Sequence, residues 1–440
     1  MAGSRLRAPA TASGSVGLLA AWCLLSAGDA LHEGEYTPVG LACVVLGFAV
    51  AVAVVAGGWA MRPVTRRDLV LPAAVAVGFA VFHPATHLMH VSGGRLLATQ
   101  LLAAATALAL VGSLLAAGNQ QKWWAWLVGS LGAVTGVVTI LVVTDPHIDV
   151  WFLLQQSSTG LLHGDDMYRQ HWVHSTGLQA IYPYLPGTTV VLAPFRWVLG
   201  DVRYGLLLAV LVAAYLVRRL DRAAPVALAG LLLAMPHFTF LIDQSWTEPL
   251  LVAALAGAVL ALRERRSTAA MLCLAAALAC KQHIVLLLPV FAMWPGFGLR
   301  RTAQSCGLAA LVILPWVVAG PHDIWHDAVH ANLALGVLRR ALCLPSLFSR
   351  WGFTVGFWFP LLGIVATYLL VWRRMPRTPA GLALSCALVM WALDLTNKQS
   401  FFNHYTLPMG LLVVAVAAAD RVPVTPPTTS PQPTTEAALA

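Results

Sequence analysis

Three ionisable side chains close a long apolar run of this sequence. The stretch "TDPHIDVW" places Asp145, His147 and Asp149 on alternate positions. An ionised aspartate can accept a proton from a hydroxyl group when it is held close to that group. We therefore take Asp149 as the first candidate for a general base and Asp145 as the second. The competing interpretation of Asp149 is structural, because a carboxylate at a helix start caps free backbone amides.

Two tyrosines form a second group of candidate side chains. The stretch "YPYLPGTT" places Tyr182 and Tyr184 on either side of Pro183, and Pro186 follows. Proline restricts the backbone, so we expect the two rings to be held in place. Tyrosine is also common at membrane interfaces without any further role. We interpret Tyr182 and Tyr184 as substrate-binding residues.

No metal or other cofactor is expected from the sequence. His83, His87 and His90 share one helical face, and such a spacing can bind zinc. No acid or cysteine accompanies them, which favours packed or interfacial histidines. The adjacent acids of "GDDMY" could hold a divalent cation, but a solvated loop is the simpler interpretation.

The composition indicates an integral membrane protein. Of the 440 residues, 59% are hydrophobic and 10% are charged, and the mean hydropathy is +0.76, whereas globular domains carry about 25% charged residues. The net charge of +9 is spread over short loops, as topology signals are. We expect an all-α polytopic fold whose partner is the lipid bilayer, and no nucleic-acid partner.

Apolar runs recur along the chain, and a spanning helix needs roughly 20 such residues, so we expect roughly 12–14 spans. Segment 184–199 is short and bounded by prolines, and we predict that it does not fully cross. Segments 268–280 and 282–297 are predicted to form a hairpin that turns at Lys281. Residues 150–162 carry their leucines on one helical face, which predicts an amphipathic helix on the membrane surface. The apolar runs lie near 15–31, 37–61, 69–90, 96–117, 123–144, 184–199, 204–217, 223–242, 246–262, 268–280, 282–297, 303–320, 351–372, 378–396 and 404–419.

The basic residues predict an orientation. With the N-terminus inside, most basic clusters fall on the cytoplasmic side, and most acids, including Asp145 and Asp149, fall outside. A smaller group of basic residues falls outside, although basic residues usually lie on the cytoplasmic side. Binding of an anion at the outer face would explain their position. These exceptions are Arg95, Arg169, Arg196, Arg203, Lys281, Arg339, Arg340, Arg350 and Lys398.

We divide the chain into two disordered termini, a set of extra N-terminal helices and a catalytic core. Residues 1–13 and the Pro- and Thr-rich segment 420–440 are expected to be disordered. Residues 14–122 are expected to form extra N-terminal transmembrane helices. Residues 123–419 would form the catalytic core, with an external loop at 145–183.

Several motifs occur in the order and spacing of a known family. They are "LLHGDDMY", "YPYLPGTTVVLAPF", "ACKQHIVLLLPVFA", "LCLPSLFSRWGF" and "TNKQSFFNHYTLPMGLL". With the acid that opens the loop, they resemble glycosyltransferase family 87, membrane enzymes of actinobacteria with the GT-C fold that use polyprenyl-phosphate sugars. The resemblance covers about residues 123–419. One departure is Gln282, which stands where the family usually has proline.

This resemblance implies an inverting transfer of mannose or arabinofuranose from a polyprenyl-phosphate donor to a cell-envelope glycan or glycolipid. The reaction would take place on the outer face of the bacterial cell (inner) membrane. The family's base corresponds to Asp149, with Asp145 as the second choice. The leaving phosphate is anionic and needs positive charge and hydrogen bonds.

We place Lys281 and Lys398 first among the groups that could bind this phosphate, because both lie at helix ends in apolar surroundings. Arg340 follows, and snorkelling to the interface is the alternative for each. Asp394 precedes Lys398 by four positions, an order that favours an internal ion pair. His404 falls on the same side and could bind the phosphate or the acceptor.

A polytopic transporter or lipid flippase is the alternative from another class. It predicts paired internal repeats and ionisable residues near the middle of the membrane. The sequence shows no clear repeat, and its acids gather at one mouth of the membrane, which favours an enzyme. An inactive scaffold that keeps the fold is a third interpretation.

Overall fold

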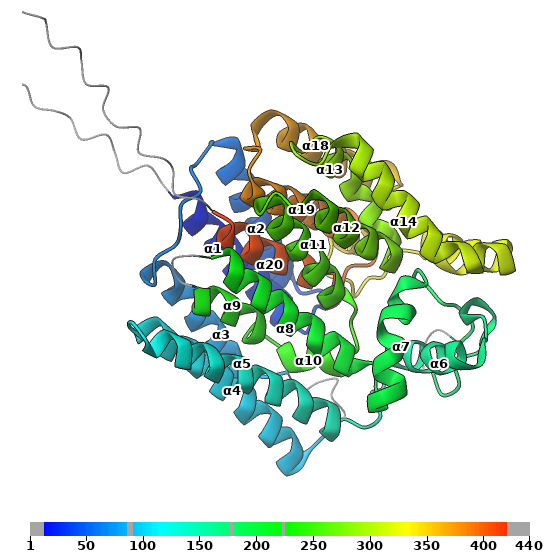
Figure 1. Cartoon of the computed structure of the whole chain (residues 1–440), viewed down its shortest axis with the longest axis horizontal. Coiled ribbons are helices and arrows are strands. Elements are labelled where there is room, and N and C mark those ends of the chain that lie inside the picture. Colours follow the sequence, from blue (N-terminus) through cyan, green and yellow to red (C-terminus); the bar gives the residue numbers. More distant parts are fainter. Residues whose placement is uncertain (1–12, 86–90, 176–178, 222–224, 420–440) are drawn as a thin grey trace, which may run out of the picture.

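Helices make up the regular structure of the chain in the computed structural model (Figure 1), which describes residues 13–85, 91–175, 179–221 and 225–419. Within these residues no β-strand forms, and one isolated antiparallel bridge pairs Glu35 with Ala341. The predicted all-α class is confirmed, as expected where lipid offers backbone amides no partner. Residues 1–12 and 420–440 lie outside the described residues, so of the two termini expected to be disordered only Ser13 is described. His87 and His90 also lie outside the described residues.

The helix bounds define the elements used below. In chain order they are α1 (Gly14–Ala30), α2 (Pro38–Ala56), η1 (Arg67–Leu69), α3 (Val70–Phe82), α4 (Gly93–Leu115), α5 (Gln120–Val142), α6 (Asp149–His163), η2 (Met167–Arg169), α7 (Gly187–Leu199), α8 (Arg203–Leu220), α9 (Pro225–Leu233), α10 (Phe238–Asp243), α11 (Glu248–Arg263), α12 (Ser267–Cys280), η3 (Gln282–Leu287), α13 (Leu288–Ala292), α14 (Gly298–Ala319), α15 (Pro321–Ile324), the π-helix η4 (Trp325–His330), α16 (Ala331–Ala334), α17 (Leu344–Arg350), α18 (Trp358–Arg374), α19 (Pro379–Thr396) and α20 (Phe402–Ala417).

Five of the described helices are long and apolar enough to cross a bilayer, namely α2, α4, α5, α14 and α19. The bent pair α7 and α8 makes a sixth if it is counted as one span. These helices support a multi-pass membrane protein, but they are fewer than the roughly 12–14 spans expected from apolar run lengths. The difference arises because other apolar runs form shorter helices, such as α1 with 17 residues and α20 with 16.

The basic loops gather at one end of the helix bundle, which we call the basic end. There Arg263 donates to the Leu220 carbonyl at 2.5 Å, and Arg219 pairs with Glu264 at 3.2 Å. The Arg377 guanidinium lies over the Trp294 ring at the same end. The ends of α5, α12 and α19 that carry the candidate site residues lie at the opposite end, which we call the site end.

The N-terminal helices are packed into the middle of the bundle. Helix α1 contacts α20, and α2 contacts α18 and α19, so these helices lie side by side in Figure 1. One continuous apolar core contains residues from Leu18 to Ala418. The boundary expected between residues 122 and 123 therefore does not separate two cores.

The hairpin between α1 and α2 is joined to the C-terminal loops at the site end. Tyr36 N–H donates to the Arg340 carbonyl at 2.8 Å, and Gly34 packs directly on Phe402. Gly34 has φ +76°, and a Cβ atom there would lie 2.1 Å from the Phe402 nitrogen. Only glycine fits this position, both for its backbone angle and for the close approach.

Helices α6 and α7 lie at the periphery of the bundle (Figure 1). The helix predicted over 150–162 is confirmed as α6, which Gly164 follows in the left-handed conformation. Its placement on the membrane surface stays a prediction. Between α7 and α8 the chain turns by 116°. With 13 residues, α7 is too short to span alone, where roughly 20 residues are needed. The hairpin predicted to turn at Lys281 is also present, between α12 and η3.

Candidate active site

The candidate base Asp149 is the first residue of α6. Its Oδ1 accepts a hydrogen bond from the Val150 N–H at 2.8 Å, so the carboxylate does occupy the electropositive start of a helix. The side chain is partly exposed at the site end. Asp145 is exposed and precedes the buried Pro146, outside any helix.

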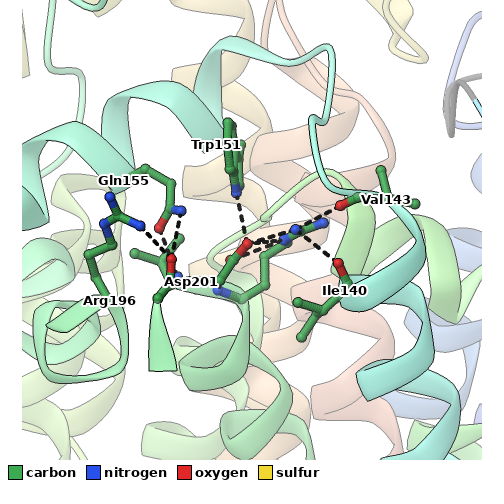
Figure 2. A network of polar contacts seen from close by, with 9 residues as sticks. Ile140, Val143, Trp151, Gln155, Arg196 and Asp201 are labelled. Carbon is green, nitrogen blue, oxygen red and sulfur yellow. Dashed lines mark hydrogen bonds and ion pairs between the residues drawn. The ribbon is translucent and has the colours of Figure 1, made fainter. Parts of the chain in front are cut away.

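A buried network holds the start of α6 against α5 and α8 (Figure 2). The Arg203 side chain is 1% exposed and pairs with Asp201 through Nε at 3.0 Å and Nη2 at 2.6 Å. Nη2 also donates to the carbonyl of Val143 at 2.8 Å, and to that of Ile140, at the end of α5. Trp151 Nε1 donates to Asp201 from the first turn of α6 at 3.4 Å. Arg203 therefore caps α5 and orients the turn that carries Asp149.

Arg196 has a comparable structural task at the end of α7. Its Nε donates to Thr159 Oγ1 at 3.0 Å, and its Nη1 donates to the Gly200 carbonyl at 2.5 Å. Gln155 accepts from the Val202 N–H at 2.9 Å and joins α6 to the same turn. These bonds satisfy backbone groups that a helix end leaves unpaired. Arg196 and Arg203 therefore stabilise this corner through contacts within the protein.

The two candidate tyrosines are both buried but make different contacts. Tyr182 is fully buried, and its hydroxyl lies 2.5 Å from Thr189 Oγ1 while its N–H donates to Asp327 at 2.9 Å. A ring enclosed in this way holds the loop and has no free surface for a ligand, contrary to the binding role proposed from the sequence. The Tyr184 carbonyl accepts from the Tyr168 hydroxyl at 2.9 Å.

Lys281 is buried in a set of polar side chains from four parts of the chain. Its Nζ lies 2.5 Å from Glu248 Oε1 and 5.1 Å from the centre of the Tyr184 ring. Asn403 Nδ2 donates weakly to the same Glu248 oxygen at 3.4 Å. The ammonium charge is therefore compensated by Glu248 within the protein.

His404 and Asp394 lie beside this pair. His404 Nδ1 is 3.7 Å from Asp394 Oδ1, and the histidine side chain is 29% exposed. Burial raises the pKa of Tyr184 well above its usual value, and the carboxylates of Glu248 and then Asp149 raise it further. The Tyr184 hydroxyl therefore keeps its proton at neutral pH and can donate a hydrogen bond.

The remaining cations lie at the rim of this cluster. Lys398 Nζ donates to the Leu333 carbonyl at 2.6 Å, so the ion pair with Asp394 that the spacing favoured is replaced by this contact and the His404 contact. Arg340 is exposed, 3.8 Å from Glu35 Oε1 and above the Phe401 ring. We call four basic side chains at the site end the cationic rim: the exposed Arg339, Arg340 and Arg350 and the half-buried Lys398.

Comparisons with protein families, with curated proteins and with solved structures find no match to this chain. The site must therefore be interpreted from its own geometry. Among the described residues, no group of three or more His, Cys, Asp or Glu side chains is arranged to hold a metal ion. Of the three histidines considered for zinc, His83 stacks on His237, and the other two lie outside the described residues.

The structure thus brings Tyr184, Lys281 and His404 together at the site end, and Asp149 opens α6 at the same end. Glu248 is the residue that the sequence interpretation did not include as a functional candidate. An acid that opens an apolar helix is costly in a membrane and is often functional, and "TEPLLVAALAG" contains that signal.

Proposed function

We propose that the protein is a membrane glycosyltransferase that moves a sugar, mannose or arabinofuranose, from a polyprenyl-phosphate donor to a hydroxyl of a cell-envelope glycan or glycolipid. The observation that carries this proposal is the convergence of a carboxylate, a tyrosine, a lysine and a histidine from distant parts of the chain at one end of the bundle. The order of the motifs that resemble family 87 and its GT-C fold supports the same class.

In this proposal Asp149 acts as the base. Its carboxylate takes the proton of the acceptor hydroxyl, whose oxygen attacks the anomeric carbon while the bond to the phosphate oxygen breaks. Attack opposite the leaving group inverts the configuration at that carbon. The network of Arg203 and Asp201 would keep the base in place during the reaction.

The position of the phosphate follows from the charge distribution. Lys281 is already neutralised by Glu248, and the Asp149 carboxylate at the start of α6 adds negative charge at the same end of the bundle. A phosphate would be repelled there, whereas the cationic rim offers guanidinium and ammonium groups. We therefore assign the phosphate to the rim and the sugar hydroxyl groups to the carboxylates of the cluster.

The proposed location is the outer face of a bacterial inner membrane. The basic end of the bundle carries the arginine clusters of several loops, and such clusters stay on the cytoplasmic side. The site end would then face outward. Single cysteines at positions 145 and 300, labelled with a membrane-impermeant maleimide in intact cells, test this orientation. Position 145 should react and position 300 should not, and the reverse pattern would overturn it.

A transporter is the second candidate, and one observation favours it. Glu248, Lys281, Asp394 and Asp29 are buried ionisable residues in the helix bundle. Such residues often mark ion or substrate pathways in membranes. A flux assay in proteoliposomes separates this candidate from the enzyme, because a transferase produces a new covalent product in detergent without any gradient.

The deciding experiment uses the purified protein with two labelled donors, polyprenyl-phosphomannose and polyprenyl-phosphoarabinofuranose, and a glycan acceptor. Formation of product with one donor, followed by linkage analysis with inversion, would support the proposal. Absence of product with both donors, for a protein shown to be folded by its thermal unfolding, would refute it.

A further inference from the structure

Gln282, next to Lys281, joins three segments of the site end. Its Nε2 group donates to the Pro183 carbonyl at 2.9 Å and to the Ala328 carbonyl at 2.6 Å. Pro183 lies between Tyr182 and Tyr184 in the loop before α7. One amide group thus connects the turn after α12 to the tyrosine loop and to the π-helix η4.

The π-helix makes further bonds to the same loop. Asn332 Nδ2 donates to the Ala328 carbonyl at 3.1 Å and lies 3.4 Å from the Pro183 carbonyl. Asp327 accepts from the Tyr182 N–H through Oδ2 and contacts His326 Nδ1 at 2.8 Å through Oδ1. A π-helix is rare and often lies at a functional site.

We infer that Gln282 is a positioning residue, which holds the Tyr182–Tyr184 loop at a fixed distance from Lys281. Tyr184 contacts the Lys281 ammonium through its ring, and Lys281 contacts Glu248. If the Pro183 carbonyl moves, the Tyr184 ring moves with it, and the cluster loses the geometry that a reacting group requires. The segment Pro321–Ala334 thereby becomes part of the site, although none of its side chains, all within the described residues, forms a hydrogen bond or an ion pair with Lys281.

The chemistry of the amide makes this inference testable. Gln282→Glu keeps the shape of the side chain. An ionised carboxylate has no N–H or O–H group, however, so it cannot donate to the two carbonyls. The bonds to Pro183 and Ala328 must then break. Gln156→Glu is the matched control, because Gln156 Nε2 donates to a single carbonyl, that of Val173, on an exposed part of α6.

Hydrogen exchange of the full-length protein in nanodiscs, read by mass spectrometry, is the first measurement. The backbone amides of Tyr182 and Leu185 are bonded to Asp327 and to the Cys280 carbonyl. Gln282→Glu should speed their exchange by about fivefold or more, the effect of losing one net hydrogen bond. Exchange within about twofold of wild type in this peptide, as for Gln156→Glu, would overturn the inference.

A second variant keeps the test decisive if Gln282→Glu does not fold. Asn332→Ala removes only the amide on the π-helix side and should produce a smaller increase at the same amides. The double variant Gln282→Ala/Asn332→Ala should exceed the sum of the two single alanine variants, because each amide can partly replace the other at the same two carbonyls. Additive effects would mean that the two residues act on separate features.

The kinetic part of the inference rests on the proposed function. In a transfer assay, Gln282→Glu should lower kcat by about tenfold or more with little change in the donor KM, as expected for lost positioning. Faster exchange with an unchanged kcat would overturn the positioning role. If wild type transfers no sugar, the proposed function fails, and the exchange data alone decide whether Gln282 fixes the loop.

Discussion

Lys281 and Glu248 form a buried ion pair between the end of α12 and the start of α11. The Nζ and Oε1 atoms are 2.5 Å apart, and the side chains are 6% and 2% exposed. Breaking such a pair leaves an uncompensated charge away from water, which costs about 3–5 kcal/mol. This relationship gives the first prediction.

Glu248→Gln should therefore lower the free energy of unfolding by about 3–5 kcal/mol, measured from thermal unfolding in detergent. The double variant Glu248→Gln/Lys281→Met should recover part of this loss, because no charge remains buried. Glu264→Gln, which breaks the exposed pair with Arg219, should cost less than about 1 kcal/mol. Equal losses at the two sites would show that Lys281 is not dependent on Glu248.

Asp149→Asn should reduce sugar transfer by about 10²–10⁴-fold, the usual contribution of a general base, without changing thermal stability. Asp145→Asn is the matched control and should retain most activity, because Asp145 is exposed and lies before α6. Full activity of the Asp149 variant, measured with labelled donor, would shift the role of base to Asp145.

Arg340→Gln and Lys398→Gln should raise the donor KM by about tenfold each, because each removes a charge-assisted contact to the phosphate. The donor KM should also depend less on salt in these variants, since screening acts on exposed charges. Arg374→Gln at the basic end changes the net charge equally and should leave the KM unchanged. A donor KM that is insensitive to both rim residues would place the phosphate elsewhere.

Arg203→Lys should loosen the start of α6, because a lysine cannot make the forked contact with Asp201 and still reach the carbonyls of α5. Hydrogen exchange in residues 145–155 should rise by about fivefold or more. Arg219→Lys at an exposed pair is the control. Unchanged exchange would mean that packing alone holds α6.

The ion pair between Asp323 and Arg169 predicts a pH dependence outside the membrane. The hydrogen bond from Arg169, at 2.6 Å, lowers the pKa of Asp323 below its usual value. A carboxyl with a lowered pKa stabilises the fold above its unfolded pKa of about 3.9 and loses this effect as the pH falls through its lower folded pKa. Protection of residues 321–334 from exchange should therefore be constant between about pH 5 and 8 and fall only in stronger acid. Loss of protection already near neutral pH would contradict this assignment.

Much of the local structure could be predicted from the sequence. The leucine spacing over 150–162 gave the bounds of α6 to within a residue. The short run 184–199 contains the 13-residue helix α7, and whether it crosses the membrane stays a prediction. The number of spanning helices could not be obtained in this way, because apolar run length does not show where a helix breaks. His237 and Ser245, between α9 and α11, have positive φ angles that interrupt the helix. The spacing of apolar residues in the sequence does not predict such breaks.

The candidate residues of the site could be chosen from the sequence, but their pairing could not. Spacing and charge identified Asp149, Tyr184, Lys281 and His404, but which charges pair depends on contacts between distant helices. The order of Asp394 and Lys398 favoured a local pair that the tertiary contacts replace. Gln282 departs from the proline usual in the family that the motifs resemble, and only the structure shows the two carbonyls that an amide can bind there.

The contact of Gly34 with Phe402 has a consequence for how the protein is made. The ribosome synthesises the chain from its N-terminus to its C-terminus. The α1–α2 hairpin therefore enters the bilayer long before α19 and α20 have been made. Until the last helices are inserted, the surface that will meet them is covered only by lipid or by an insertion factor. The contact of Gly34 with Phe402 can thus form only after α20 has been inserted, and a chain truncated near residue 400 would carry every earlier helix without this closure.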